Sequence, residues 1–185
     1  MDNRRPPILA ICGIKNSGKT TCLEQLVAEF ACLGLRVAVI KHDGHEFQGD
    51  VPGTDSWRMY QAGAFGTAVC SGTQVLLHKR QEGAVETEKQ LEQAAESFFE
   101  ADLILVEGMK GLPIPKLEII REGISKIPVS NPKGRIGILT DITTDREEFA
   151  RATGYEPGEA ERLYLLGRPK ELAQELRNIF LIQGG

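Results

Sequence analysis

The chain has 185 residues, the length of one domain, and a formal net charge of −4. Its hydrophobic fraction of 41% and charged fraction of 26% are ordinary for a globular protein that builds a core without disulfides or metals. The acidic balance excludes a general attraction to nucleic acid or to an anionic membrane, so we expect neither partner. The apolar run at residues 8–12 is too short for a signal peptide, and no stretch reaches transmembrane length, which predicts a cytoplasmic protein. The four cysteines, Cys12, Cys22, Cys32 and Cys70, lack CxxC spacing and are interpreted as buried free thiols rather than metal or redox residues.

Strand and helix patterns alternate from the start of the chain. The apolar run at residues 8–12 precedes a glycine-rich loop, a helical pattern at 20–33 and a second strand pattern at 36–41. Together they predict a βαβ unit with a right-handed crossover. Residues 42–54 are polar and rich in glycine and proline, and are interpreted as a long loop that carries function.

The rest of the chain continues the alternation. After a short helix at 55–63, expected to be capped by Thr54 or Asp55, come a hairpin (66–70 and 74–78), a helix (87–99), strands (102–108, 116–121, 135–140 and 163–166) and a closing helix (169–180). Residues 145–162 are charged and turn-rich, and no element is assigned to them. The pattern predicts a single α/β domain over residues 1–185, a three-layer fold whose mostly parallel sheet is flanked by helices. The hairpin is an addition to that fold.

The segment between the first strand and the first helix carries the strongest motif. Residues 13–20, Gly-Ile-Lys-Asn-Ser-Gly-Lys-Thr, match the Walker A pattern GxxxxGK[ST] of P-loop nucleotide-binding proteins. Glycines let backbone N–H groups turn toward an anion, and the helix dipole favours negative charge there. Lys19 is expected to contact the β- and γ-phosphates and assist catalysis, and the Thr20 hydroxyl to bind Mg²⁺. The expected nucleotide-binding residues are Gly13, Lys15, Asn16, Ser17, Gly18, Lys19, Thr20 and Thr21. For Lys15, a solvated loop lysine is the competing interpretation.

A second acidic ligand for Mg²⁺ should end an apolar strand. Asp102 precedes its strand, whereas Glu107 follows four apolar residues and emerges at the carboxyl edge, where ligands bind in parallel sheets. We therefore assign the metal role to Glu107, beside Thr20.

The polar loop after the second strand also leaves the carboxyl edge of the sheet. Asp43 and Glu46 could bind Mg²⁺ or orient a water, and Asp43 is expected to orient the attacking water. His42 and His45 suggest zinc only weakly, because no further ligand completes a tetrahedral set. Farther along, Asp55 is either a helix cap or, with Arg58, a contact to a ligand or second subunit.

Asp141 directly follows the apolar strand at 135–140. A carboxylate there could accept hydrogen bonds from the N1–H and 2-amino group of guanine, so Asp141 is a candidate base-reading residue. The asparagine-lysine-x-aspartate signature is absent, and a turn-capping aspartate explains the position almost as well.

Several segments together resemble the molybdopterin-guanine dinucleotide biosynthesis accessory protein MobB family. They are the Walker A loop, Lys41-His42 with His45, Asp50–Arg58, Ala62-Gly63-Ala64, Val106–Lys110 and Pro113–Arg121. The resemblance covers residues 8–141, and its most discriminating parts are the proline-glycine-x-aspartate-serine and proline-lysine-x-glutamate segments. The chain departs from the family at Thr54, where lysine is usual, and at Gly44, where a second histidine often stands.

The resemblance implies a GTP-binding protein with weak Mg²⁺-dependent hydrolysis, primarily an accessory or delivery protein rather than an efficient enzyme. It implies action on the molybdopterin cofactor with the guanylyltransferase MobA, and a homodimer built partly through exchanged strands, for which the hairpin region is the candidate. An ATP-dependent small-molecule ligase of the dethiobiotin-synthetase-like P-loop class is the alternative, because Glu107-Gly108 fits that class too. A nucleotide kinase ranks last, since no arginine-rich lid segment is evident.

Overall fold

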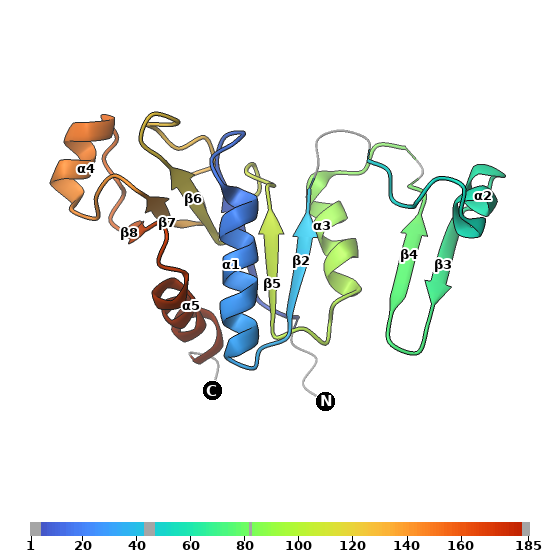
Figure 1. Ribbon diagram of the computed structural model, residues 1–185. Coiled ribbons are helices and arrows are strands. Elements are labelled where there is room, and N and C mark those ends of the chain that lie inside the picture. Colours follow the sequence, from blue (N-terminus) through green and yellow to red (C-terminus); the bar gives the residue numbers. More distant parts are fainter. Residues whose placement is uncertain (1–4, 43–46, 82, 183–185) are drawn as a thin grey trace. The chain divides into compact units, whose positions relative to one another are not determined.

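The computed structural model describes residues 5–42, 47–81 and 83–182. These residues form two compact units (Figure 1). The first holds the described residues up to His42 together with those from Thr87 onward, and it contains the Walker A loop. The second holds the described residues between them and contains the hairpin.

The first unit is built on a six-stranded sheet in the order β2-β5-β1-β6-β7-β8. Every neighbouring pair is parallel, which confirms the α/β prediction. The strands are β1 (Ile8–Cys12), β2 (Val37–Lys41), β5 (Leu103–Glu107), β6 (Lys116–Ile120), β7 (Arg135–Thr140) and β8 (Arg162–Leu165). The sheet order has one feature that the sequence did not predict: β5 lies between β1 and β2. Four of its five residues are buried, as expected for a strand that has a neighbouring strand on each side and is covered on both faces.

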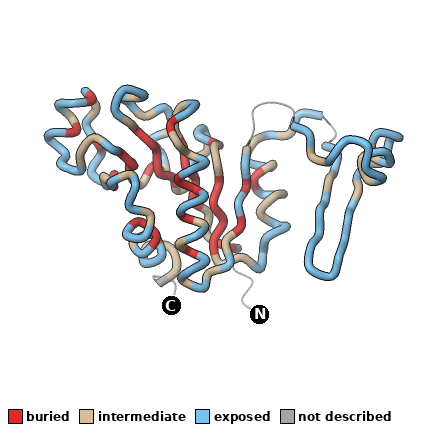
Figure 2. The backbone as a smooth tube through the Cα atoms, viewed as in Figure 1, coloured by how far each residue is buried: buried red, intermediate tan, exposed pale blue. Residues whose placement is uncertain are grey.

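Helices cover both faces of this sheet. On one face, the odd-numbered residues of β1 and β5 pack with α1 (Lys19–Cys32) and α5 (Pro169–Arg177), which continues into a short π-helical segment, η1 (Asn178–Ile182). On the other face, the even-numbered residues of the same strands pack with α3 (Thr87–Glu96). Since side chains alternate between the faces of a strand, both faces of β1 and β5 are apolar and buried (Figure 2). Among the described residues, no helix has the length and apolar character needed to cross a bilayer.

The turn-rich segment at 145–162 contains a helix, α4 (Arg146–Thr153), which the sequence reasoning missed. Asp145 caps it by accepting a hydrogen bond from the Glu148 amide, and Gly154 ends it in a left-handed conformation with φ 76°. Phe149 is its one large buried anchor, packed with Ile120 and Ile138. Asp145 and Gly154 are typical residues for the two ends of a helix, but one large apolar residue in eight does not produce the repeating apolar pattern by which an amphipathic helix is recognised.

The second unit consists of α2 (Asp55–Gln61) and the antiparallel pair β3 (Gly66–Cys70) and β4 (Val75–Lys79). Thr54 is the N-cap of α2 and accepts a hydrogen bond from the Trp57 amide, as expected. Most residues of the hairpin are exposed (Figure 2), including apolar ones. The hairpin therefore has an uncovered apolar surface. A two-stranded sheet with such a surface is only marginally stable on its own.

Candidate functional site

The Walker A loop connects the carboxyl end of β1 to the first turn of α1, as expected. Its backbone takes left-handed conformations at Asn16 (φ 64°) and Gly18 (φ 93°), and Gly13 has φ 143°. A β-carbon on Gly13 would stand 2.7 Å from Ser17 Oγ and 3.1 Å from the Ile119 carbonyl oxygen, so only glycine fits there. Ser17 is completely buried, and its hydroxyl has no hydrogen-bond partner among the described residues.

The donors of this loop suit an anion. Gly18 is the N-cap of α1, and because it has no side chain it cannot accept a hydrogen bond from the amides of the first turn. These amides are therefore available to an anion bound in the loop. The Lys19 ammonium lies across the loop and donates to the carbonyl oxygens of Gly13 at 3.2 Å and Ile14 at 2.7 Å. Amides, a helix N-terminus and a lysine converge on one small region, which is the donor set that a polyphosphate requires.

The two residues expected to bind metal are in direct contact. Thr20 Oγ1 donates a hydrogen bond to Glu107 Oε2 at 3.0 Å, although the residues are 87 positions apart. Neighbouring oxygen ligands of octahedral Mg²⁺, each at about 2.1 Å, stand roughly 3 Å apart, so the two oxygens already have the required spacing. No group of three or more His, Cys, Asp or Glu side chains among the described residues could hold a metal. The pair therefore fits Mg²⁺, which takes one or two protein ligands and completes its shell with phosphate and water.

Glu107 and Asp102 lie at opposite ends of β5, and only Glu107 is near the loop. Asp102 accepts hydrogen bonds from the Arg36 amide at 2.7 Å and guanidinium at 3.2 Å, at the amino edge of the sheet. The hydrogen bond from the Arg36 amide lowers the pKa of Asp102. Its role is to tie the start of β5 to the start of β2.

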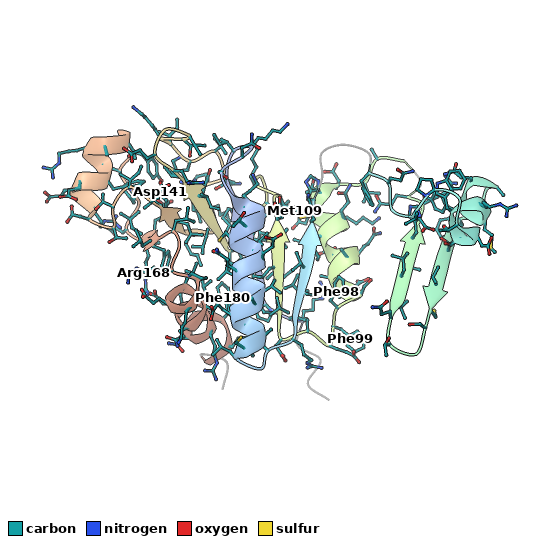
Figure 3. All side chains as sticks on the ribbon, in the orientation of Figure 1. Phe98, Phe99, Met109, Asp141, Arg168 and Phe180 are labelled. Atoms are coloured by element: carbon teal, nitrogen blue, oxygen red, sulfur yellow. The ribbon has the colours of Figure 1, made fainter. Side chains whose placement is uncertain are left out.

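Beyond Glu107 the chain turns sharply beside the end of β2. Gly108 has φ 100° and Met109 has φ 51°, an uncommon conformation for a residue with a side chain. The Gly108 α-carbon packs against His42, because a β-carbon there would be 3.3 Å from the His42 carbonyl oxygen. Met109 itself is buried in the core (Figure 3). His42 thus lies beside the acid at the carboxyl edge.

Asp141, the candidate base-reading residue, follows β7 and is engaged by the end of β6 (Figure 3). Its Oδ1 accepts from the Glu122 amide at 2.9 Å, and its Oδ2 accepts from Arg121 Nε at 2.9 Å. Burial alone would raise the pKa of Asp141, but these two hydrogen bonds lower it overall. The Arg121 contact is one that the sequence reasoning missed.

A buried ionic network explains the proline-lysine-x-glutamate segment. Lys116 and Glu118 are almost completely buried, and Lys116 Nζ donates to the carbonyl oxygens of Asn131 and Lys133. Glu118 accepts from the amide and hydroxyl of Ser130, and it lies 3.6 Å from Arg135. Burial lowers the pKa of Lys116. These side chains hold the connection between β6 and β7 rather than a ligand.

The remaining predicted residues are placed as follows. Lys15, Asn16 and Thr21 are exposed on the Walker A loop and the first turn of α1. Asp43, Gly44, His45 and Glu46 lie outside the described residues. In the second unit, Asp55 and Arg58 form an exposed pair at 3.7 Å on α2.

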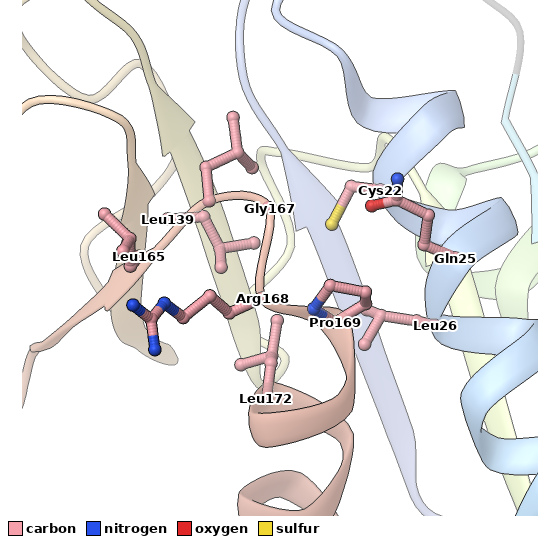
Figure 4. A pocket seen from close by; sticks show the side chains of 10 residues that line it. Cys22, Gln25, Leu26, Leu139, Leu165, Gly167, Arg168, Pro169 and Leu172 are labelled. Atoms are coloured by element: carbon pink, nitrogen blue, oxygen red, sulfur yellow. The ribbon is translucent and has the colours of Figure 1, made fainter.

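A small, mainly apolar pocket lies beside α1 (Figure 4). It is lined by residues of α1, β7, the connection from β8 to α5, and α5: Cys22, Gln25, Leu26, Leu139, Leu165, Leu166, Gly167, Arg168, Pro169 and Leu172. The Leu166 amide donates to the Thr140 carbonyl oxygen at 2.7 Å, which joins this connection to the segment before Asp141. The pocket therefore lies on the side of the loop away from Glu107.

A parallel sheet with a Walker A loop after its first strand and an acid after a neighbouring strand defines a P-loop protein. Residues 8–141 match the family described as "Molybdopterin guanine dinucleotide synthesis protein B", MobB. The chain belongs to this family.

Relatives and solved structures agree with this assignment. The chain is 41% identical over 130 residues to the molybdopterin-guanine dinucleotide biosynthesis adapter protein of Haemophilus influenzae, covering 67% of this chain and 68% of the relative. It is 34% identical over 122 residues to the adapter protein of Escherichia coli, covering 66% and 70%. The crystal structure of Bacillus subtilis MobB is similar with a TM-score of 0.64 and 26% identity, covering 92% of this chain and 96% of that one. The structural similarity therefore extends past Asp141, where the family match ends.

Proposed function

We propose that this protein is a nucleotide-dependent adapter in the synthesis of molybdopterin guanine dinucleotide, binding GTP with Mg²⁺ and hydrolysing it slowly. The contact between Thr20 and Glu107 carries the proposal, because it joins the Walker A loop to an acid at the spacing of two Mg²⁺ ligands. Family membership supplies the pathway, since the family and its curated relatives are named for this synthesis.

The chain's own residues account for phosphate binding. The amides of the first turn of α1 and the Lys19 ammonium would neutralise the phosphates, and Lys19 would exchange its present carbonyl acceptors for phosphate oxygens. Thr20 and Glu107 would hold Mg²⁺, directly or through water, and the ion would supply further charge neutralisation. We propose that Asp43 orients the attacking water.

The guanine preference rests on the family. The order β5-β1-β6-β7 puts the metal residues on one side of the loop, so a bound base would extend toward the other side, where Asp141 lies. Asp141 is the base-reading candidate of the sequence analysis, and both of its carboxylate oxygens already accept hydrogen bonds, from Arg121 Nε and from the Glu122 amide.

We propose that the partners are the guanylyltransferase MobA, the molybdopterin cofactor and a second copy of this chain. The dimer proposal is supported by the exposed apolar residues of the second unit, among them Phe65, Val69, Val75, Leu76 and Leu77. Because such a surface on two strands is unfavourable in water, a second copy is a suitable cover. Light scattering of the purified protein tests this point, and a monomer across the micromolar range would contradict it.

The deciding experiment is a calorimetric titration of GTP and ATP, each with and without Mg²⁺, followed by a hydrolysis assay. We expect tighter binding of GTP, dependence on Mg²⁺, and slow turnover in the absence of the guanylyltransferase. A preference for ATP, with rapid hydrolysis once a small acceptor is supplied, would instead indicate the ligase of the dethiobiotin-synthetase type. A pull-down of the guanylyltransferase with and without GTP tests the adapter role.

A further inference from the structure

Arg121 lies at the end of β6, and its guanidinium reaches the Walker A loop. Its Nη1 is 3.6 Å from the position that a β-carbon on Gly18 would take. Gly18 is the N-cap of α1, so this cation stands beside the first-turn amides that the loop offers to an anion. The side chain is 36% exposed, which leaves it accessible to a ligand in the loop.

Asp141 fixes the direction of this guanidinium. One oxygen of the carboxylate accepts a hydrogen bond from Arg121 Nε at 2.9 Å, and the other accepts one from the Glu122 amide at 2.9 Å. The Nη groups of Arg121 have no hydrogen-bond acceptor within the ranges that the structure describes. The ion pair therefore uses the Nε donor to hold the side chain and leaves the other donors free for an acceptor at the loop.

The sheet order separates this cation from the metal residues. β5 and β6 flank β1 on opposite sides, so Glu107 with Thr20 lies on one side of the loop and Arg121 on the other. A polyphosphate in the loop would meet Mg²⁺ on one flank and a guanidinium on the other. Arginine suits this position, because its fork of N–H donors matches phosphate oxygens and its charge is permanent.

We propose that Arg121 contacts the phosphates of the bound nucleotide and that Asp141 is the positioning residue that holds it there. The inference rests on the proposed nucleotide binding and deepens it. In this arrangement Asp141 acts through Arg121, in place of the base-reading role that its position suggests. Its contribution is then independent of the base, whereas a base-reading aspartate would contribute to GTP binding alone.

The test compares two arginine–aspartate pairs in the full chain. Arg121→Gln and Asp141→Asn change the pair at the loop, and Arg36→Gln and Asp102→Asn change a matched pair at the amino edge of the sheet. The dissociation constants of Mg²⁺ complexes of GTP, ATP and inorganic tripolyphosphate are measured by calorimetry. We expect Arg121→Gln to weaken all three by roughly 10- to 100-fold, the range for a hydrogen bond to a charged group. Asp141→Asn should weaken all three by a common, smaller factor, and the amino-edge variants should bind like the wild type.

A second readout separates phosphate contact from a change in fold. Guanidinium chloride at a non-denaturing concentration should raise the affinity of Arg121→Ala for tripolyphosphate and leave the wild type unchanged. Unaltered affinity in Arg121→Gln would overturn the proposal, and so would a loss in Asp141→Asn that is confined to GTP. If the wild type binds tripolyphosphate but shows no preference for GTP, the guanine-specific function fails while the role of Arg121 is still supported by its variants.

Discussion

The hydroxyl of Thr20 and the carboxylate of Glu107 are joined by a 3.0 Å hydrogen bond across the carboxyl edge of the sheet. Thr20 belongs to the first turn of α1, and Glu107 is the last residue of β5, the strand next to β1. The contact exists because β1 and β5 pair in register, with Ile11 opposite Glu107. The parallel pairing of two buried strands thus brings the two oxygens to the distance that Mg²⁺ requires.

Replacing Glu107 by Gln tests the metal role at this contact. Glutamine keeps an oxygen that accepts the Thr20 hydrogen bond but removes the charge, so we expect Mg²⁺-dependent hydrolysis to fall more than nucleotide affinity. Nucleotide affinity with and without Mg²⁺ and the hydrolysis rate are measured together. Asp102→Asn is the matched control, because Asp102 precedes the same strand at its other end. Equal loss of binding and hydrolysis, or of neither, would move the metal role to another residue.

Lys19→Ala tests the phosphate role of the Walker A loop. Among the described residues, the side chain donates to two carbonyl oxygens of its own loop, so its removal breaks no hydrogen bond to another element there. We expect GTP affinity to be lost while the unfolding midpoint in urea stays near that of the wild type. Lys15→Ala is measured in parallel, because Lys15 is exposed on the same loop and its two interpretations differ in outcome: a phosphate contact predicts weaker GTP binding, and a solvated lysine predicts little change. Near-normal GTP affinity in Lys19→Ala would contradict the phosphate role.

The sequence predicted the strands and most helices, and it singled out Thr20 and Glu107, because their patterns are local. The apolar runs at 8–12 and 103–107 mark buried strands by themselves, and a Walker A loop followed by an acid at a strand end identifies Thr20 and Glu107 separately. Strand order cannot be read in this way, since the place of β5 between β1 and β2 depends on pairing with residues 96 positions away in β1 (Ile8 with Ile104) and 66 positions away in β2 (Val37 with Leu103). No local pattern records these pairings.

The contact between Arg121 and Asp141 escaped prediction for the same reason. Each residue follows a different strand, and only the pairing of β6 with β7 places them side by side. Lys116 and Glu118 were recognised as discriminating residues of the family, but their burial was not expected, because charged residues are seldom buried without partners. Those partners come from the β6–β7 connection and from Arg135.

Arg135→Met should destabilise the fold strongly. The Arg135 side chain is 5% exposed, and it pairs with Glu161 Oε1 at 2.6 Å and with Glu118 at 3.6 Å. Methionine fills similar space but leaves two buried carboxylates without their cation, which typically costs about 3–5 kcal/mol. Arg36→Met is the control, because its pair with Asp102 is exposed and its loss should change stability little. Urea unfolding measures both, and similar losses in the two variants would contradict the role assigned to the buried network.

The four cysteines should separate into two reactive and two protected thiols. The expectation of buried thiols is confirmed for Cys12 and Cys22 and is wrong for Cys32 and Cys70, which are exposed. Burial raises the pKa of Cys12 and Cys22 from 9.0 to about 11. Because the thiolate is the reactive form, a disulfide reagent at pH 8 should modify two thiols quickly and the other two only after unfolding. The same shifts predict a pH dependence of stability. Between pH 9 and about 11 the unfolded chain loses the proton that the native thiol keeps, so the free energy of unfolding should fall as pH rises through that window.

Cys22→Ala isolates one of the two buried thiols. It should lower by one the number of thiols that react only after unfolding. It should also reduce the fall in the free energy of unfolding at alkaline pH, because one fewer group then has a higher pKa in the native state than in the unfolded state. Cys32→Ala is the control for the reagent count, since it should remove a fast-reacting thiol. Urea unfolding at pH 8 and pH 10 measures the slope. Fast modification of all four thiols at pH 8 in the native state would contradict the burial of Cys12 in β1 and of Cys22 on α1.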